Sequence, residues 1–174
     1  MGSVSPEAYG DYFAWGETEP KSYYDWSTYK WCNGSYKTQT KYCTNSSYGT
    51  VDGKTVLDLE DDAAYVNMGS EWRMPTYAQQ DELRNNCSWS WTTQNGVKGY
   101  KVTGPNSNSI FLPAAGYRDN SYLLSAGSSG YYWSSSLYGS NPYDAFELGF
   151  YSGNYNWVND SRCYGHSVRA VVRR

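Results

Sequence analysis

Few residues in this chain of 174 amino acids could carry out catalysis. Nucleophilic catalysis of the serine–histidine type needs a base, and the single histidine is His166, within the turn-like segment 164–167. Cys163 lies three residues before it, but we expect an exposed turn histidine rather than a thiol–imidazole dyad. The adjacent acids at 60–62 fit the first turn of a helix better than an acid–base pair. The sequence therefore predicts no catalytic residues and no enzyme activity.

The four cysteines lack the spacing of a structural zinc site. They include no Cys-x-x-Cys pair, and four Cys or His ligands at such spacings would be needed. Cys32 and Cys43 flank a stretch of turn formers and could form a local disulfide, while Cys87 and Cys163 could close a long loop. Buried free thiols are the alternative, and the sequence does not choose among these states.

Oxygen-bearing side chains in the last third could form a calcium site. Asn141-Pro142 precedes Trp157-Val158-Asn159-Asp160, and this arrangement resembles the calcium site of sugar-binding C-type lectins. Val158 interrupts the Trp-Asn-Asp triplet, however, and an acidic residue beside the proline is missing. Calcium takes six to eight oxygen ligands. We therefore expect no metal and no cofactor, and keep calcium as an alternative.

The segment from Tyr131 to His166 has the composition of a contact surface. Its 36 residues include seven Tyr, six Ser, four Gly and four Asn, with no Lys. Tyr and Trp provide rigid contact area and Ser, Gly and Asn provide adaptable hydrogen bonds, as in antibody paratopes. Aromatic faces beside Asn and Asp also suit sugar rings. We assign Trp133 and Phe150 to the core, but the stretch 154–160 is too polar for a core and is predicted to bind ligand.

The composition of the whole chain favours a loop-rich recognition protein. Val, Leu, Ile and Phe together number only 23, whereas there are 20 Tyr and 8 Trp, so buried aromatic rings must build the core. The net charge of −3 argues against nucleic-acid binding, which needs a basic stripe. No apolar run is long enough to insert into a membrane. The opening Met-Gly-Ser is typical of an expression start, which is compatible with the removal of an export signal or a preceding domain; the sequence does not decide this.

The local patterns predict an α+β fold, with short helices packed on antiparallel strands and long loops, in one domain over 1–174. A short helix is expected over 58–66 with a stop at Gly69, and a second after Pro75, where Thr76 and Gln79 fit a capping box. Residues 9–31 predict a short strand and an irregular aromatic segment, and residues 32–56 a loop or loose hairpin. Further strands are predicted at Gly99–Thr103, Ser109–Leu112, Tyr131–Ser135, Ala145–Tyr151 and Ser167–Val172.

An ordered series of motifs runs through nearly the whole chain. Its members are YGDYFAWGET (9–18), WRMPT (72–76), FLPAAGYR (111–118), YWSSS (132–136) and GHSVR (165–169). The series resembles the major paralogous domain family (FISUMP) of secreted and surface proteins of gut Bacteroidetes. That resemblance implies a C-type lectin-like fold. The Trp-Arg-x-Pro-Thr motif is also similar to one in the formylglycine-generating enzyme superfamily, which shares the fold, but the catalytic cysteines of that branch are not evident.

The stretch 131–169 resembles the variable region of proteins that retroelements diversify by adenine-targeted mutagenesis. The resemblance implies a fixed scaffold and a set of displayed, ligand-binding residues. The scaffold would be Trp133, Ser134, Ser135, Ala145, Leu148, Phe150, Gly165, Ser167, Val168 and Arg169. The displayed residues would be Tyr138, Asn141, Tyr143, Asp144, Phe146, Tyr151, Asn154, Tyr155, Asn156, Trp157, Asn159, Asp160 and Tyr164.

Together these patterns predict a ligand-binding adhesin or receptor-binding module. Its partner would be a protein or glycan on another cell or host surface, and its location extracellular, on the cell surface or on a phage particle. A calcium-dependent carbohydrate-binding lectin is the alternative. An enzyme of the formylglycine-generating type is the remaining candidate, and it would need a reactive cysteine.

Overall fold

The computed structural model describes residues 1–173. Its helical part is small and starts where the sequence predicts it: a 3₁₀ turn η1 (Leu59–Asp61), α1 (Ala63–Met68) and α2 (Tyr77–Asn86). The Asp62 side chain caps α1, and Gly69 ends it with a φ of 94°. Thr76 and Gln79 form the expected capping box of α2. Both predicted helices are confirmed.

Within residues 1–173, ten short strands make up the rest of the regular structure, and they pair antiparallel in four small sheets. The sheets are β1–β10, β2–β3–β4, β5–β6 and β7–β8–β9. The fold is therefore α+β with mostly antiparallel strands. The strands are β1 (Trp72–Arg73), β2 (Ser88–Gln94), β3 (Val97–Thr103), β4 (Ser109–Pro113), β5 (Tyr117–Asp119), β6 (Tyr122–Leu124), β7 (Ser129–Leu137), β8 (Asp144–Tyr151), β9 (Asn154–Ser161) and β10 (Val171–Val172).

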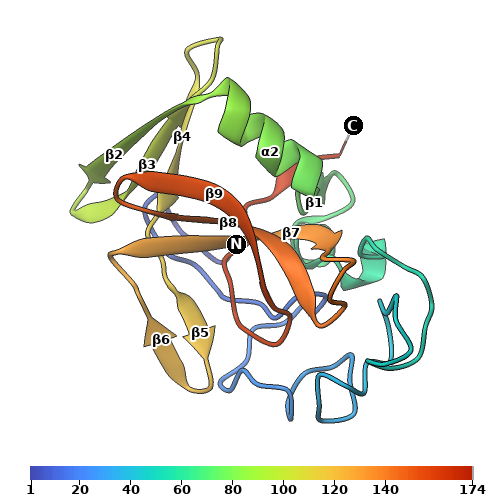
Figure 1. The fold of residues 1–174 in the computed structure, drawn as a ribbon. Helices are drawn as coiled ribbons and strands as arrows, with labels where there is room; N and C mark the ends of the chain where they lie inside the picture. Colours follow the sequence, from blue (N-terminus) through green and yellow to red (C-terminus); the bar gives the residue numbers. More distant parts are fainter. Residues whose placement is uncertain (174) are drawn as a thin grey trace.

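The sheet β7–β8–β9 lies at the centre of the molecule (Figure 1). Helix α2 lies along one side of it and contacts all three strands. The blue-to-cyan loops of the first third lie mainly on the other side. The sheet is thus covered on one face by α2 and the β2–β3–β4 sheet, and over part of the other face by loops.

Hydrogen bonds from aromatic side chains hold the loops of the first third in place. The Tyr24 hydroxyl donates to the Tyr12 carbonyl at 2.6 Å, and the Tyr29 hydroxyl donates to the Trp15 carbonyl at 2.7 Å. The fully buried Arg162 guanidinium donates to the Tyr29 hydroxyl and to three backbone carbonyls, two of them in the loops around position 41 and 42. These bonds replace the strand ladders that this region lacks.

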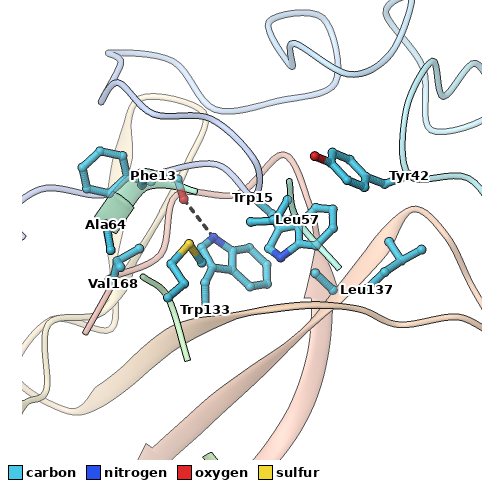
Figure 2. Packing of buried hydrophobic residues seen from close by; sticks show 11 residues of the cluster. Phe13, Trp15, Tyr42, Leu57, Ala64, Trp133, Leu137 and Val168 are labelled. Atoms are coloured by element: carbon cyan, nitrogen blue, oxygen red, sulfur yellow. Dashed lines mark hydrogen bonds between the residues drawn. The ribbon is translucent and has the colours of Figure 1, made fainter. Parts of the chain in front are cut away.

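Aromatic rings dominate the core, as the composition predicts. Figure 2 shows Trp133 of β7 among Phe13, Trp15 and Val168, with its indole N–H donating to the Phe13 carbonyl at 2.8 Å. Phe150 of β8 is also buried, and Gly130 lies opposite it, where a Cβ would clash with the Phe150 ring at 2.3 Å. The assignment of Trp133 and Phe150 to the core is confirmed.

Several expectations from the sequence are wrong. Of the strand predicted over Ser167–Val172, only β10 forms, and residues 9–31 form isolated bridges instead of a strand. Strands β1, β2, β5, β6 and β9 were not predicted. All four cysteines are free thiols, so neither possible disulfide forms.

Candidate functional site

The β8–β9 hairpin carries most of the residues predicted to bind ligand. Ser152 and Gly153 form its two-residue turn, where Gly153 has a φ of 95°. The register pairs Gly149 with Asn156 and Leu148 with Trp157. Because side chains alternate along a strand, consecutive residues of β9 point to opposite faces.

We name the two faces of this sheet by their residues. The inner face is directed toward α2 and the β2–β3–β4 sheet, and the outer face away from them. The inner face comprises Tyr132, Phe146, Leu148, Phe150, Tyr155, Trp157 and Asn159. The outer face comprises Tyr131, Trp133, Ala145, Glu147, Gly149, Tyr151, Asn154, Asn156, Val158 and Asp160, and its end at Trp133 and Ala145 is buried.

Tyr155 on the inner face packs within the protein. Its ring stacks on Trp89 of β2 with centroids 4.5 Å apart and an interplanar angle of 9°. It also meets the Tyr100 ring edge to face at 5.6 Å. Tyr155 thereby joins the sheet to β2 and β3 and is not primarily a displayed residue.

Trp157, also on the inner face, closes the contact with the start of α2. Its ring meets Tyr77 at 5.3 Å and Phe146 at 5.6 Å, both edge to face. Tyr138 packs against Phe146 from the loop after β7 at 5.1 Å. These four half-buried rings form an aromatic cluster between α2 and the sheet, so three predicted contact residues have intramolecular partners.

The outer face contains a hollow of about 200 Å³ centred on Gly149. Tyr131 and Tyr151 line it together with Asn156 and Val158. A Cβ on Gly149 would lie 3.1 Å from Val158 Cγ2 and 3.7 Å from the Tyr131 ring, so a side chain at this position would crowd the space that these residues border. Tyr151 is 55% exposed at its rim. The hollow offers aromatic, amide and aliphatic contacts to a ligand.

Next to the hollow, Glu147 and Asp160 converge on His166. The histidine is fully buried and stacks on Trp133 with centroids 4.0 Å apart, so the expectation of an exposed turn histidine is wrong. The histidine is buried because two carboxylates from other segments enclose it: the Glu147 carboxylate contacts Nδ1, and Asp160 Oδ2 lies 3.5 Å from Nε2. Burial alone would lower the pKa of His166, but the two carboxylates raise it to about 9.

The remaining residues that were predicted to bind ligand do not line the hollow. Asp144 is buried and accepts a hydrogen bond from Asn159 Nδ2 at 2.9 Å, so its display was predicted wrongly. Tyr143 packs against Tyr36 and Tyr48 of the first third, at 5.3 and 5.1 Å. Tyr164 lies beside Tyr117, at 5.8 Å, near the His166 end of the outer face, and Asn141 is half-buried in the loop before β8.

The structure does not assemble the calcium site considered from the sequence. Asn159 and Asp160 are neighbours in β9 and point to opposite faces. Asn159 contacts Asp144, whereas Asp160 faces His166. The oxygens of the Trp-Val-Asn-Asp segment therefore do not converge on one ion.

Sequence reasoning missed Tyr131, Gly149 and Val158 as lining residues. If 154–160 had been treated as a strand with alternating side chains, Val158 would have been placed on the same face as Asn154 and Asn156. Two larger hollows, of about 500 Å³ each, lie elsewhere. One is beneath α2, among Trp72, Leu83 and other mostly apolar side chains, and the other is near the N-terminus.

One family model matches the chain, described as a domain of unknown function (DUF8237), over residues 89–171. The match is slightly shorter than half of the chain and includes the whole β7–β8–β9 sheet. Comparisons with curated proteins and with solved structures return no match. Among the residues described, no helix has the length and apolar character needed to span a membrane.

Proposed function

We propose that this protein is a recognition module that binds a protein or glycan ligand at the outer face of the β7–β8–β9 sheet. The observation that carries the proposal is the hollow at Gly149, bordered by tyrosine rings and asparagine amides. Such a surface would bind a ligand without catalysing a reaction. Tyr131 and Tyr151 would bury part of the ligand surface, and Asn154 and Asn156 would fix the orientation of the ligand by hydrogen bonds.

The finer proposal is a C-type lectin-like fold of the FISUMP kind, with 131–169 as a retroelement-diversified region. The motif series supports it. So does burial, because the proposed scaffold residues Trp133, Ala145, Leu148 and Phe150 lie in the core, where diversification would cost stability. Extracellular, cell-surface or phage display follows from the same resemblance.

The diversification has its own test in the encoding DNA. A nearby reverse transcriptase gene with a template repeat that matches codons 131–169 except at adenines would support it. An otherwise matching repeat without adenine-specific differences would contradict it.

Ligand binding is tested by filling the hollow. Fluorescently labelled protein is applied to a printed glycan array and to a panel of intact bacterial and host cells, as wild type and as Gly149→Val. Valine suits a strand, and its branches occupy the hollow. We expect the wild type to bind a subset of probes, and Gly149→Val to lose that binding while it keeps a cooperative thermal unfolding transition.

The matched control is Tyr138→Phe, which keeps the ring on the opposite side of the sheet. We expect it to bind like the wild type. Binding that survives in Gly149→Val, or that depends on the inner aromatic cluster instead, would contradict the proposed surface.

A further inference from the structure

Glu147, Asp160 and His166 converge at one point of the sheet. Glu147 is 1% exposed and His166 is fully buried. Glu147 Oε2 and His166 Nδ1 contact each other, whereas His166 Nε2 has no hydrogen-bond partner. A buried polar atom without a partner is costly, so Nε2 is the atom that calls for a ligand.

The geometry at Nε2 does not correspond to a hydrogen bond. The distance to Asp160 Oδ2 is 3.5 Å, beyond the usual range of about 2.7–3.2 Å for an N–H···O bond. Two ligand atoms bound at about 2.0–2.2 Å to a tetrahedral ion lie roughly 3.3–3.5 Å apart. Stacking on Trp133 fixes the plane of the ring, and so the direction of Nε2.

Asp160 presents one carboxylate oxygen to this point. Its Oδ1 accepts a hydrogen bond from the Ser161 backbone N–H at 2.8 Å, which leaves Oδ2 directed at His166. The Asp160 side chain is 31% exposed, whereas His166 is enclosed. A small ion can therefore reach the pair from the outer face.

A second carboxylate cluster provides the contrast. Asp58, Glu60 and Asp61 surround Lys41, whose Nζ lies 2.7, 3.3 and 2.6 Å from their oxygens. There the chain itself supplies the cation. At Glu147 and Asp160 no lysine or arginine of residues 1–173 forms an ion pair, and the facing group is an imidazole.

We propose that His166 Nε2 and Asp160 bind a divalent transition-metal ion of the zinc type, which displaces the Nε2 proton of the imidazolium to solvent. Imidazole nitrogen with carboxylate oxygen suits zinc, whereas calcium and magnesium prefer oxygen ligands alone. Glu147 is the positioning residue: it contacts Nδ1 and orients the ring, as carboxylates do behind metal-bound histidines. Water or a ligand on the outer face completes the coordination. The site does not depend on the proposed recognition function.

The test is isothermal titration of chelator-treated protein with ZnCl₂. We expect one ion per chain and a Kd that rises at least about tenfold in Asp160→Asn. Asp160→Asn preserves shape at a partly exposed position, which keeps the variant folded. The matched control is Glu60→Gln in the lysine-filled cluster, with an unchanged Kd. Because the chain has free thiols, CoCl₂ provides a second readout: visible d–d bands without a thiolate charge-transfer band.

Two results would overturn the proposal. One is the absence of a saturable one-to-one isotherm for the wild-type protein. The other is a Kd in Asp160→Asn equal to that of the wild type, or a thiolate band with cobalt, which would place the ion at a cysteine. Either result leaves His166 as an imidazolium between two carboxylates.

Discussion

The two faces of the β8–β9 hairpin differ in their residues and in their surroundings. On the inner face, Tyr155 stacks on Trp89 and Trp157 packs against Tyr77. On the outer face, Tyr151 and Asn156 border an open hollow. Alternation along β9 places its two rings on the inner face and leaves asparagine, valine and aspartate on the outer face. Parity along the strand therefore separates the rings that stabilise the fold from the side chains proposed to contact a ligand.

This comparison also explains why an aromatic-rich, aliphatic-poor chain folds. Rings that would be expected to bind ligand instead join β9 to α2 and β2. Each such edge-to-face or stacked pair contributes about 0.5–1.5 kcal/mol beyond the area that it buries. The proposed contact surface is therefore smaller than the composition of 131–166 indicates, and is limited to one side of the sheet.

The largest effect is expected from a comparison of two neighbouring residues of β8, one on each face of the sheet. Phe150→Ala removes a ring that is 3% exposed, among Tyr100, Tyr132 and Trp91, and should lower the free energy of unfolding by about 3–5 kcal/mol. Tyr151→Ala, one position later on the outer face, should cost less than about 1 kcal/mol. Urea denaturation measures both, and equal losses would remove the distinction between the faces.

An intermediate effect is expected from the stack of Trp89 and Tyr155. A double-mutant cycle with Trp89→Leu and Tyr155→Leu should give a coupling energy of about 0.5–1.5 kcal/mol. The same cycle with Tyr151→Leu in place of Tyr155→Leu should give a coupling near zero. Coupling to Tyr151, or none to Tyr155, would show that the stack does not stabilise the fold.

The smallest effect concerns the pH dependence of stability through Asp144. Burial raises the pKa of this carboxyl group above its ordinary value, so the folded chain binds the proton more tightly than the unfolded chain. Its contribution to the free energy of unfolding therefore falls as pH rises above the ordinary pKa of Asp, about 3.9. Asp144→Asn should flatten this slope above about pH 4. A variant with the wild-type slope would contradict the assignment.

Local signals predicted the helices and part of the core. The Thr76–Gln79 capping box and the acidic start before Gly69 act within a few residues, so they can be read from the chain. Trp133 and Phe150 were assigned to the core because the chain has too few aliphatic residues to build one.

Contacts between distant segments could not be predicted in this way. His166 lies in a turn-like sequence, but Glu147 and Asp160 of two other segments enclose it. The asparagine-rich β9 has low strand propensity and forms because it pairs with β8 along its full length. Without that pairing, the segment 154–160 was treated as one contact unit, although half of it faces inward.

The melting temperatures of two double variants of β9 test the division of this strand most directly. Tyr155→Ala/Trp157→Ala removes inner-face rings, and Asn156→Ala/Val158→Ala removes outer-face side chains. Scanning calorimetry should show a decrease of about 10 °C for the inner pair and of about 2 °C or less for the outer pair. Equal decreases, or a larger decrease for the outer pair, would contradict the assignment of the two faces.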